Sequence, residues 1–81
     1  MEKLKKDIQS VVNIYKSGDL LKSEQLTKEL IKKNPRVAFL YNLLGVVLAH
    51  QEKNKEAMEC YKKAIELDPN FGMIYNNIGL L

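Results

Sequence analysis

Two stretches of this 81-residue chain set its fold: residues 35–45 read PRVAFLYNLLG, and residues 69–79 read PNFGMIYNNIG. They lie 34 residues apart, and this offset pairs Pro35 with Pro69, Tyr41 with Tyr75, Asn42 with Asn76, and Gly45 with Gly79. Weaker matches continue backwards into the first half of the chain, as between Val12 and Val46. A fixed period of this length is typical of a repeat protein, so the chain is predicted to be built from units of about 34 residues.

The repeating units are predicted to be pairs of helices. Apolar residues recur at helical spacing in five segments, at about 4–15, 20–31, 37–51, 55–67 and from 71 onward. Pro35 follows Asn34 and Pro69 follows Asp68, and both dipeptides end one helix and favour the start of the next. No segment alternates with period two over the length of a strand. The sequence therefore predicts an all-α fold of about five helices.

Composition excludes several classes of protein. With 46% hydrophobic and 28% charged residues, the chain is predicted to fold. A single cysteine, Cys60, rules out a disulfide framework and a multi-cysteine zinc site. No apolar run approaches the roughly 18–20 residues that span a bilayer, and the charged start at residues 1–6 lacks the apolar core of a signal peptide. We expect a cytoplasmic location and no membrane partner.

The spacing of aromatic, leucine, small and proline residues in the second half resembles the pattern of the tetratricopeptide repeat (TPR) family. The residues that carry this resemblance are Tyr41, Leu44, Gly45, Leu48, Ala57, Tyr61, Ala64 and Pro69. The resemblance implies a right-handed α-solenoid of antiparallel helix pairs. Residues 1–35 would form a degenerate repeat and residues 36–69 a typical one, best matched over Ala38–Pro69, with residues 70–81 the first helix of a truncated third. It also implies that Gly45 and Ala57 face each other across the hairpin.

The last residues of the chain suggest an exposed apolar edge. The sequence stops within an apolar stretch, Ile78-Gly79-Leu80-Leu81, with no polar cap. Terminal repeats of a solenoid normally need a polar outer face for solubility. We therefore expect a fragment of a longer repeat protein, and self-association into a homo-oligomer through Ile78, Gly79 and Leu81.

The sequence does not favour catalysis or nucleic-acid binding. One histidine, His50, and Cys60 offer no catalytic triad, the acidic residues are spread over polar faces, and no glycine-rich loop is present. We expect a protein that is not an enzyme and that needs no cofactor or metal ion. The net charge is +3, and the lysine runs carry no interleaved aromatic residues, so they are interpreted as solvated surface.

The TPR resemblance implies a binding groove. In that family the first helices of successive repeats line a concave groove that binds a peptide or a partner helix. By register the groove positions here are Ile8, Gln9, Val12, Phe39, Asn42, Leu43, Val46, His50, Met73, Asn76 and Asn77. The competing interpretation of each is packing between repeats. Ile8 and Val12 replace the Lys and Asn with which chaperone-binding members hold a terminal carboxylate, which argues against that ligand.

We thus expect a protein–protein interaction or scaffolding module. The alternative is the substrate-recruiting, N-terminal part of a TPR-containing enzyme of the glycosyltransferase or sulfotransferase type, with its catalytic domain elsewhere. Either assignment is an implication of the family resemblance, because no constellation of residues in the chain points to chemistry of its own.

Overall fold

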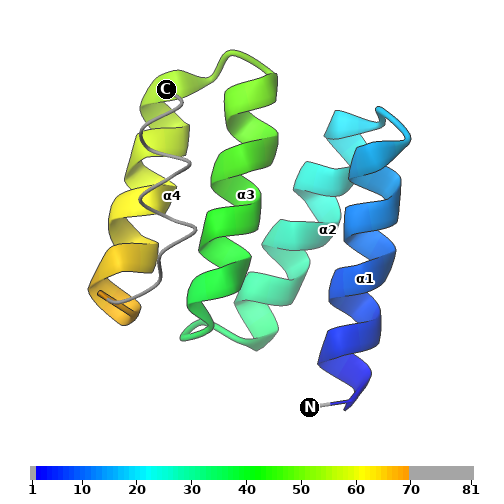
Figure 1. Cartoon of the computed structure of the whole chain (residues 1–81), viewed down its shortest axis with the longest axis horizontal. Helices are drawn as coiled ribbons and strands as arrows, with labels where there is room; N and C mark the ends of the chain where they lie inside the picture. The colour runs from blue at the N-terminus through cyan, green and yellow to red at the C-terminus, as the bar shows by residue number, and fades with distance from the viewer. Residues whose placement is uncertain (1, 70–81) are drawn as a thin grey trace.

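The computed structural model describes residues 2–69 as four consecutive helices (Figure 1). They are α1 (Glu2–Lys16), α2 (Leu20–Lys33), α3 (Ala38–His50) and α4 (Asn54–Leu67). Each helix packs against the next, and the described residues contain no strand. The all-helical, TPR-like fold is therefore confirmed, with helix bounds within a few residues of those predicted. The expected fifth helix lies outside the described residues.

Short turns join the helices within each hairpin, and each turn contains a residue with a positive φ angle. Gly18 has a φ of 95° between α1 and α2, and Glu52 has a φ of 63° between α3 and α4. The two positions are 34 residues apart, so the turn geometry repeats with the sequence period. Asp19 then caps α2 by accepting a hydrogen bond from the Lys22 amide at 3.1 Å. Glycine adopts this conformation without steric cost, which explains why the chain breaks at Gly18.

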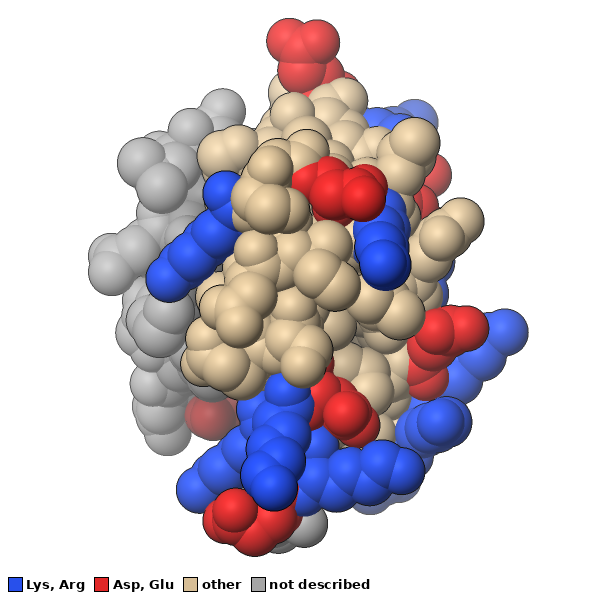
Figure 2. All heavy atoms as spheres, turned by 90° about the vertical axis from the view of Figure 1, so that its right-hand side faces the viewer, with Lys and Arg blue, Asp and Glu red and all other residues tan. Residues whose placement is uncertain are grey.

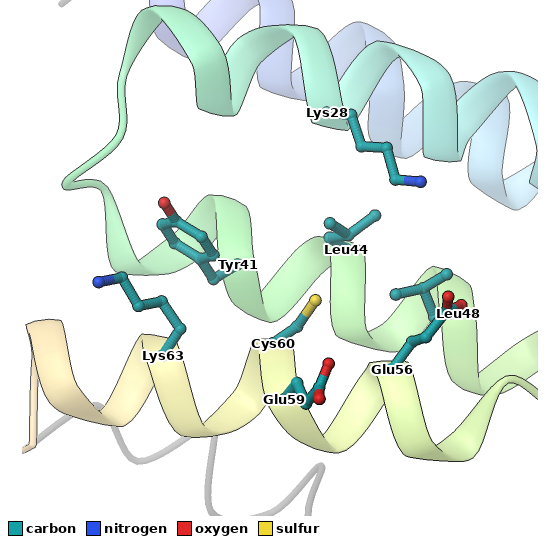
Figure 3. A pocket seen from close by; sticks show the side chains of 8 residues that line it. All are labelled: Lys28, Tyr41, Leu44, Leu48, Glu56, Glu59, Cys60 and Lys63. Carbon is teal, nitrogen blue, oxygen red and sulfur yellow. The ribbon is translucent and has the colours of Figure 1, made fainter.

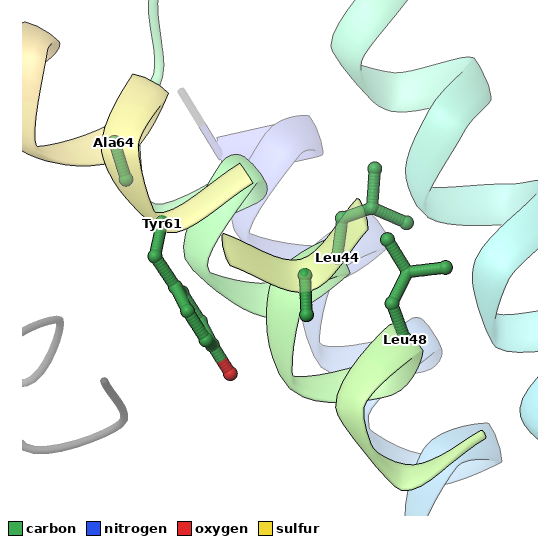
Figure 4. Close-up of a cluster of buried hydrophobic side chains, with 5 residues drawn as sticks. Leu44, Leu48, Tyr61 and Ala64 are labelled. Atoms are coloured by element: carbon green, nitrogen blue, oxygen red, sulfur yellow. The ribbon is translucent and has the colours of Figure 1, made fainter. Parts of the chain in front are cut away.

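A compact apolar cluster holds α3 against α4 (Figure 4). Its buried members are Leu44 and Leu48 on α3, and Ala57, Tyr61 and Ala64 on α4. Ile31 of α2 packs on the same cluster, so the second hairpin is also joined to the first. Burying a large apolar side chain stabilises the fold by roughly 1.5–3 kcal/mol. This cluster is therefore a principal source of the stability of the typical repeat.

Gly45 makes room for the ring of Tyr61. A Cβ atom added at Gly45 would contact Cε1 of Tyr61, and would lie 2.7 Å from its Cδ1 atom. The atoms nearest to this added Cβ all belong to Tyr61, one helical turn after Ala57, the residue that was expected to face Gly45. Glycine here serves the packing of an aromatic ring against the backbone of the facing helix.

In the degenerate first repeat, the size difference between the residues that correspond to Gly45 and Tyr61 is smaller and the bulkier apolar residue stands on the first helix. At the 34-residue offset, Val11 corresponds to Gly45 and Thr27 corresponds to Tyr61. Val11 is 3% exposed and Thr27 is fully buried, with its hydroxyl donating to the Ser23 carbonyl at 2.7 Å. A larger residue on the first helix is thus matched by a smaller one on the second. At these two positions the first repeat thus departs from the TPR pattern and still buries both residues.

A second cluster stacks the two hairpins on each other. Val11 of α1 is buried with Leu43 and Val47 of α3. Partly buried side chains from all three of α1, α2 and α3 surround them, namely Val12, Tyr15, Leu20, Leu26, Leu30 and Phe39. Through this cluster α1 meets α3, as successive helix pairs contact each other in a solenoid.

Candidate peptide-binding groove

The candidate groove is the surface of α1 and α3, which the second cluster holds together. The two helices are also joined near their C-terminal ends, where the Tyr15 hydroxyl lies 2.9 Å from Nε2 of His50. Their rings meet edge to face, with centroids 5.4 Å apart. Burial raises the pKa of Tyr15 above its ordinary value, so the hydroxyl is neutral at physiological pH. The relative position of α1 and α3 is thus set by both apolar and polar contacts.

The predicted groove residues fall into three classes of exposure. Gln9 and His50 are exposed, whereas Asn42 and Leu43 are buried, at 3% and 6% exposure. The half-buried members are Ile8, Val12, Phe39 and Val46. Met73, Asn76 and Asn77, and the predicted edge residues Ile78, Gly79 and Leu81, lie outside the described residues. The described part of the surface is therefore apolar at its half-buried positions and polar at its exposed ones.

Some of these side chains have structural partners that sequence could not reveal. Leu43 is a member of the cluster that stacks the hairpins, and Val12 and Phe39 pack against it. Gln9 donates from Nε2 to Oδ1 of Asn13 at 3.0 Å. His50, interpreted from sequence as a surface histidine, is exposed but contacts Tyr15 across the two hairpins. Packing between repeats therefore accounts for Leu43 in full and for Val12 and Phe39 in part.

Glu24 forms a polar junction that sequence reasoning missed. This residue of α2 accepts hydrogen bonds from Lys28 at 2.7 Å, from Gln51 at 2.8 Å and from Lys53 at 3.2 Å. Gln51 and Lys53 belong to the turn between α3 and α4, so the junction fastens the two hairpins together. The Lys28 hydrogen bond, assisted by those from Gln51 and Lys53, lowers the pKa of Glu24 to about 2. Only the Lys28 contact, at i, i+4 on one helix, was readable from sequence.

We predict that this junction makes stability depend on acid pH. Because the folded pKa of Glu24 lies below its unfolded value, the unfolded chain binds more protons between about pH 4.5 and pH 2. The contribution of Glu24 is complete above this window and is lost as the pH falls through it. Replacing Glu24 by Gln should lower the free energy of unfolding by about 1–2 kcal/mol at pH 7 and by much less at pH 2.

Thermal unfolding followed by circular dichroism across this pH range measures the effect. The matched control is Glu66→Gln, an exposed carboxylate of α4 in no ion pair with another described residue. If the Glu24→Gln variant lost the same stability at pH 2 as at pH 7, the charge of Glu24 would not be the source of the stabilisation.

A hollow is lined by residues of α2, α3 and α4 (Figure 3). It has a volume of about 250 Å³, with Tyr41, Leu44 and Leu48 as its apolar base and charged residues at its rim. Cys60 points into it, and burial is the main reason that the pKa of its thiol rises to about 11. The thiol is thus protonated at neutral pH and is a poor nucleophile. The hollow is also smaller than the roughly 300–1,000 Å³ of typical small-molecule sites.

Residues 2–69 contain no group of three or more His, Cys, Asp or Glu residues arranged to hold a metal ion. None of the helices described there has the length and apolar character of a membrane span.

Residues 38–71 match the model of the tetratricopeptide repeat family. The curated relatives include the peroxisomal targeting signal receptor of Candida albicans, 32% identical over 85% of this chain, and that of Saccharomyces cerevisiae, 30% identical over 70% of it. The receptor of Candida glabrata is 28% identical over 80% of the chain. The chain spans about a tenth of the length of these relatives, 12%, 9% and 11% respectively. The chain thus carries a tetratricopeptide repeat, in agreement with its helix pairs and its 34-residue period, and is a module of the protein–protein interaction type.

Proposed function

We propose that the α1–α3 surface binds a short peptide segment of another protein. The observation that carries this proposal is that the first helices of the two hairpins meet, through Val11, Leu43 and Val47 and through Tyr15 and His50, with half-buried apolar side chains on both helices. Its half-buried side chains, such as Ile8 and Val46, offer apolar area, while the exposed amide of Gln9 offers a hydrogen-bond donor and acceptor. The exposed His50, held by Tyr15, adds a second polar group.

The relatives suggest the class of peptide. Each is named as a receptor for a peroxisomal targeting signal, and a C-terminal Ser-Lys-Leu is an address of that kind. We therefore propose that the ligand is a targeting-signal peptide of a protein to be delivered. Under this proposal the chain has no catalytic site of its own and works in the cytoplasm as part of a longer protein.

Binding should depend on the apolar part of the surface. Ile8 is half-buried and belongs to neither apolar cluster, so Ile8→Asn changes the surface without opening the core. We expect this variant to weaken binding of a labelled peptide ending in Ser-Lys-Leu by about fivefold or more, which is about 1 kcal/mol. Fluorescence anisotropy measures the affinity, and amide chemical shifts should change along α1 and α3.

The matched control is Leu21→Asn, because Leu21 is an apolar residue of α2 with 67% of its surface exposed. It should bind the peptide as the unaltered chain does. Shift changes centred on α2 and α4 would contradict the proposed surface. Binding of an unrelated amphipathic helix, but not of the Ser-Lys-Leu peptide, on α1 and α3 would retain the surface and reject the targeting signal as its ligand.

A further inference from the structure

Cationic side chains from distant parts of the sequence converge at one end of the molecule. Because α1 and α2 are antiparallel, the start of α1 lies beside the end of α2 (Figure 1). This end, called the basic end below, carries Lys3, Lys5, Lys6, Lys32, Lys33 and Arg36. Figure 2 shows Lys and Arg side chains gathered there, at the lower part of the face that it presents. The sequence alone presented these residues as two short and separate runs.

These cations are not neutralised by ion pairs. All six are exposed, and none forms an ion pair with another described residue, in contrast to Lys28 and Lys53, which share Glu24. Lys3, Lys5 and Lys6 also stand in the first turns of α1, where the helix dipole is positive and favours acidic side chains. The repulsion between these lysines and the positive end of the helix dipole destabilises the start of α1. An anionic partner would offset that repulsion.

The basic end also contains a hollow whose lining is partly apolar and partly charged. Leu4 and Leu30 lie at a hollow of about 260 Å³ between α1 and α2, with Lys3 and Lys33 among its lining residues. Asp7 lines the same hollow. An apolar side chain flanked by carboxylates would fit this arrangement, since its carboxylates would meet the two lysines.

We propose that the basic end is a docking site for an acidic, extended segment of a partner protein, separate from the α1–α3 surface. Two features favour this ligand over other polyanions. Glu2, Asp7 and Glu29 lie on the same two helices as the lysines and would repel closely spaced negative charges such as a continuous phosphate backbone, whereas a peptide can place uncharged residues opposite them. Leu21, the large exposed hydrophobic residue of the described region, lies in the first turn of α2 at the opposite end, so it cannot insert into a membrane that the basic end touches.

A pair of variants with equal change in net charge tests the proposal. Lys3→Glu combined with Lys33→Glu reverses two charges at the basic end. Lys22→Glu combined with Lys55→Glu reverses two exposed charges near the starts of α2 and α4, at the opposite end. The probe is a labelled peptide of alternating Glu-Glu-Leu units, titrated by fluorescence anisotropy at low and moderate salt. Circular dichroism establishes that both variants retain their helices.

We expect the basic-end variant to lose about tenfold or more in affinity and the control variant to lose less than about twofold. Equal losses in both variants would mean that only net charge matters and would overturn the proposal. It would also be overturned if single-stranded RNA or phosphatidylserine vesicles bound the unaltered chain more tightly than the peptide at equal charge concentration. The Ile8→Asn variant should bind the acidic peptide normally, so failure of the α1–α3 proposal and failure of this one are distinguishable.

Discussion

Replacing Gly45 by valine is expected to lower the free energy of unfolding by about 3 kcal/mol, which is a large part of the roughly 4–12 kcal/mol available to a chain of this size. The first carbon of any side chain at this position already collides with the ring of Tyr61, which is 1% exposed. Removing glycine from a helix interior would favour the helix by about 1 kcal/mol. Overpacking against a buried ring outweighs this gain.

The first hairpin suggests how to rescue the variant. It carries Val11 and Thr27 where the second hairpin carries Gly45 and Tyr61, so the combination of Gly45→Val with Tyr61→Thr copies two residues that are both buried in the first hairpin. Tyr61→Thr alone should cost about 3 kcal/mol because it leaves a cavity. The double variant should be more stable than the sum of the two losses predicts, by about 1–3 kcal/mol.

A double-mutant cycle measured by urea unfolding at equilibrium determines this coupling. The native chain, the two single variants and the double variant suffice. A coupling energy within about 0.5 kcal/mol of zero would contradict the hypothesis that the residue sizes at positions 45 and 61 compensate for each other. Gly18→Ala is an informative control, since nothing lies within 4 Å of the added Cβ and any cost must come from its positive φ.

Leu43→Ala is the second change with a large expected effect, about 2–4 kcal/mol of unfolding free energy. Leu43 was predicted as a groove residue, yet only 6% of it is exposed, and it is buried with Val11 and Val47 where the hairpins stack. Truncating it should open a cavity between the repeats. The expected result is therefore lost stability, with peptide affinity unchanged once the protein is folded at low temperature.

Thermal and urea unfolding measure the first quantity, and peptide titration at low temperature measures the second. Leu21→Ala removes the same atoms from a residue that is 67% exposed and should change stability by less than about 0.5 kcal/mol. A folded Leu43→Ala variant with native stability but weakened peptide binding would assign Leu43 to the groove rather than to the stacking of the repeats.

The fold was predictable from sequence because its signals are local or periodic. Helical spacing, the Pro35 and Pro69 breaks and the 34-residue offset each involve residues that the chain itself brings into register. They were sufficient for four helices with nearly correct bounds. The groove residues were predictable only as helix positions, since the same position can face a ligand or a neighbouring repeat. Leu43 is buried against the neighbouring repeat, whereas Gln9 is exposed.

Sequence therefore establishes that this chain is a stack of helix pairs with a tetratricopeptide repeat, because period and helix pattern survive even where residue identity fades. Tertiary structure decides which side chains meet. It pairs Gly45 with Tyr61, ties Glu24 to the turn of the next hairpin, and gathers the lysines at the start of α1 with those at the end of α2. Such contacts depend on distances between residues far apart in the chain, and no local pattern of a single sequence records those distances.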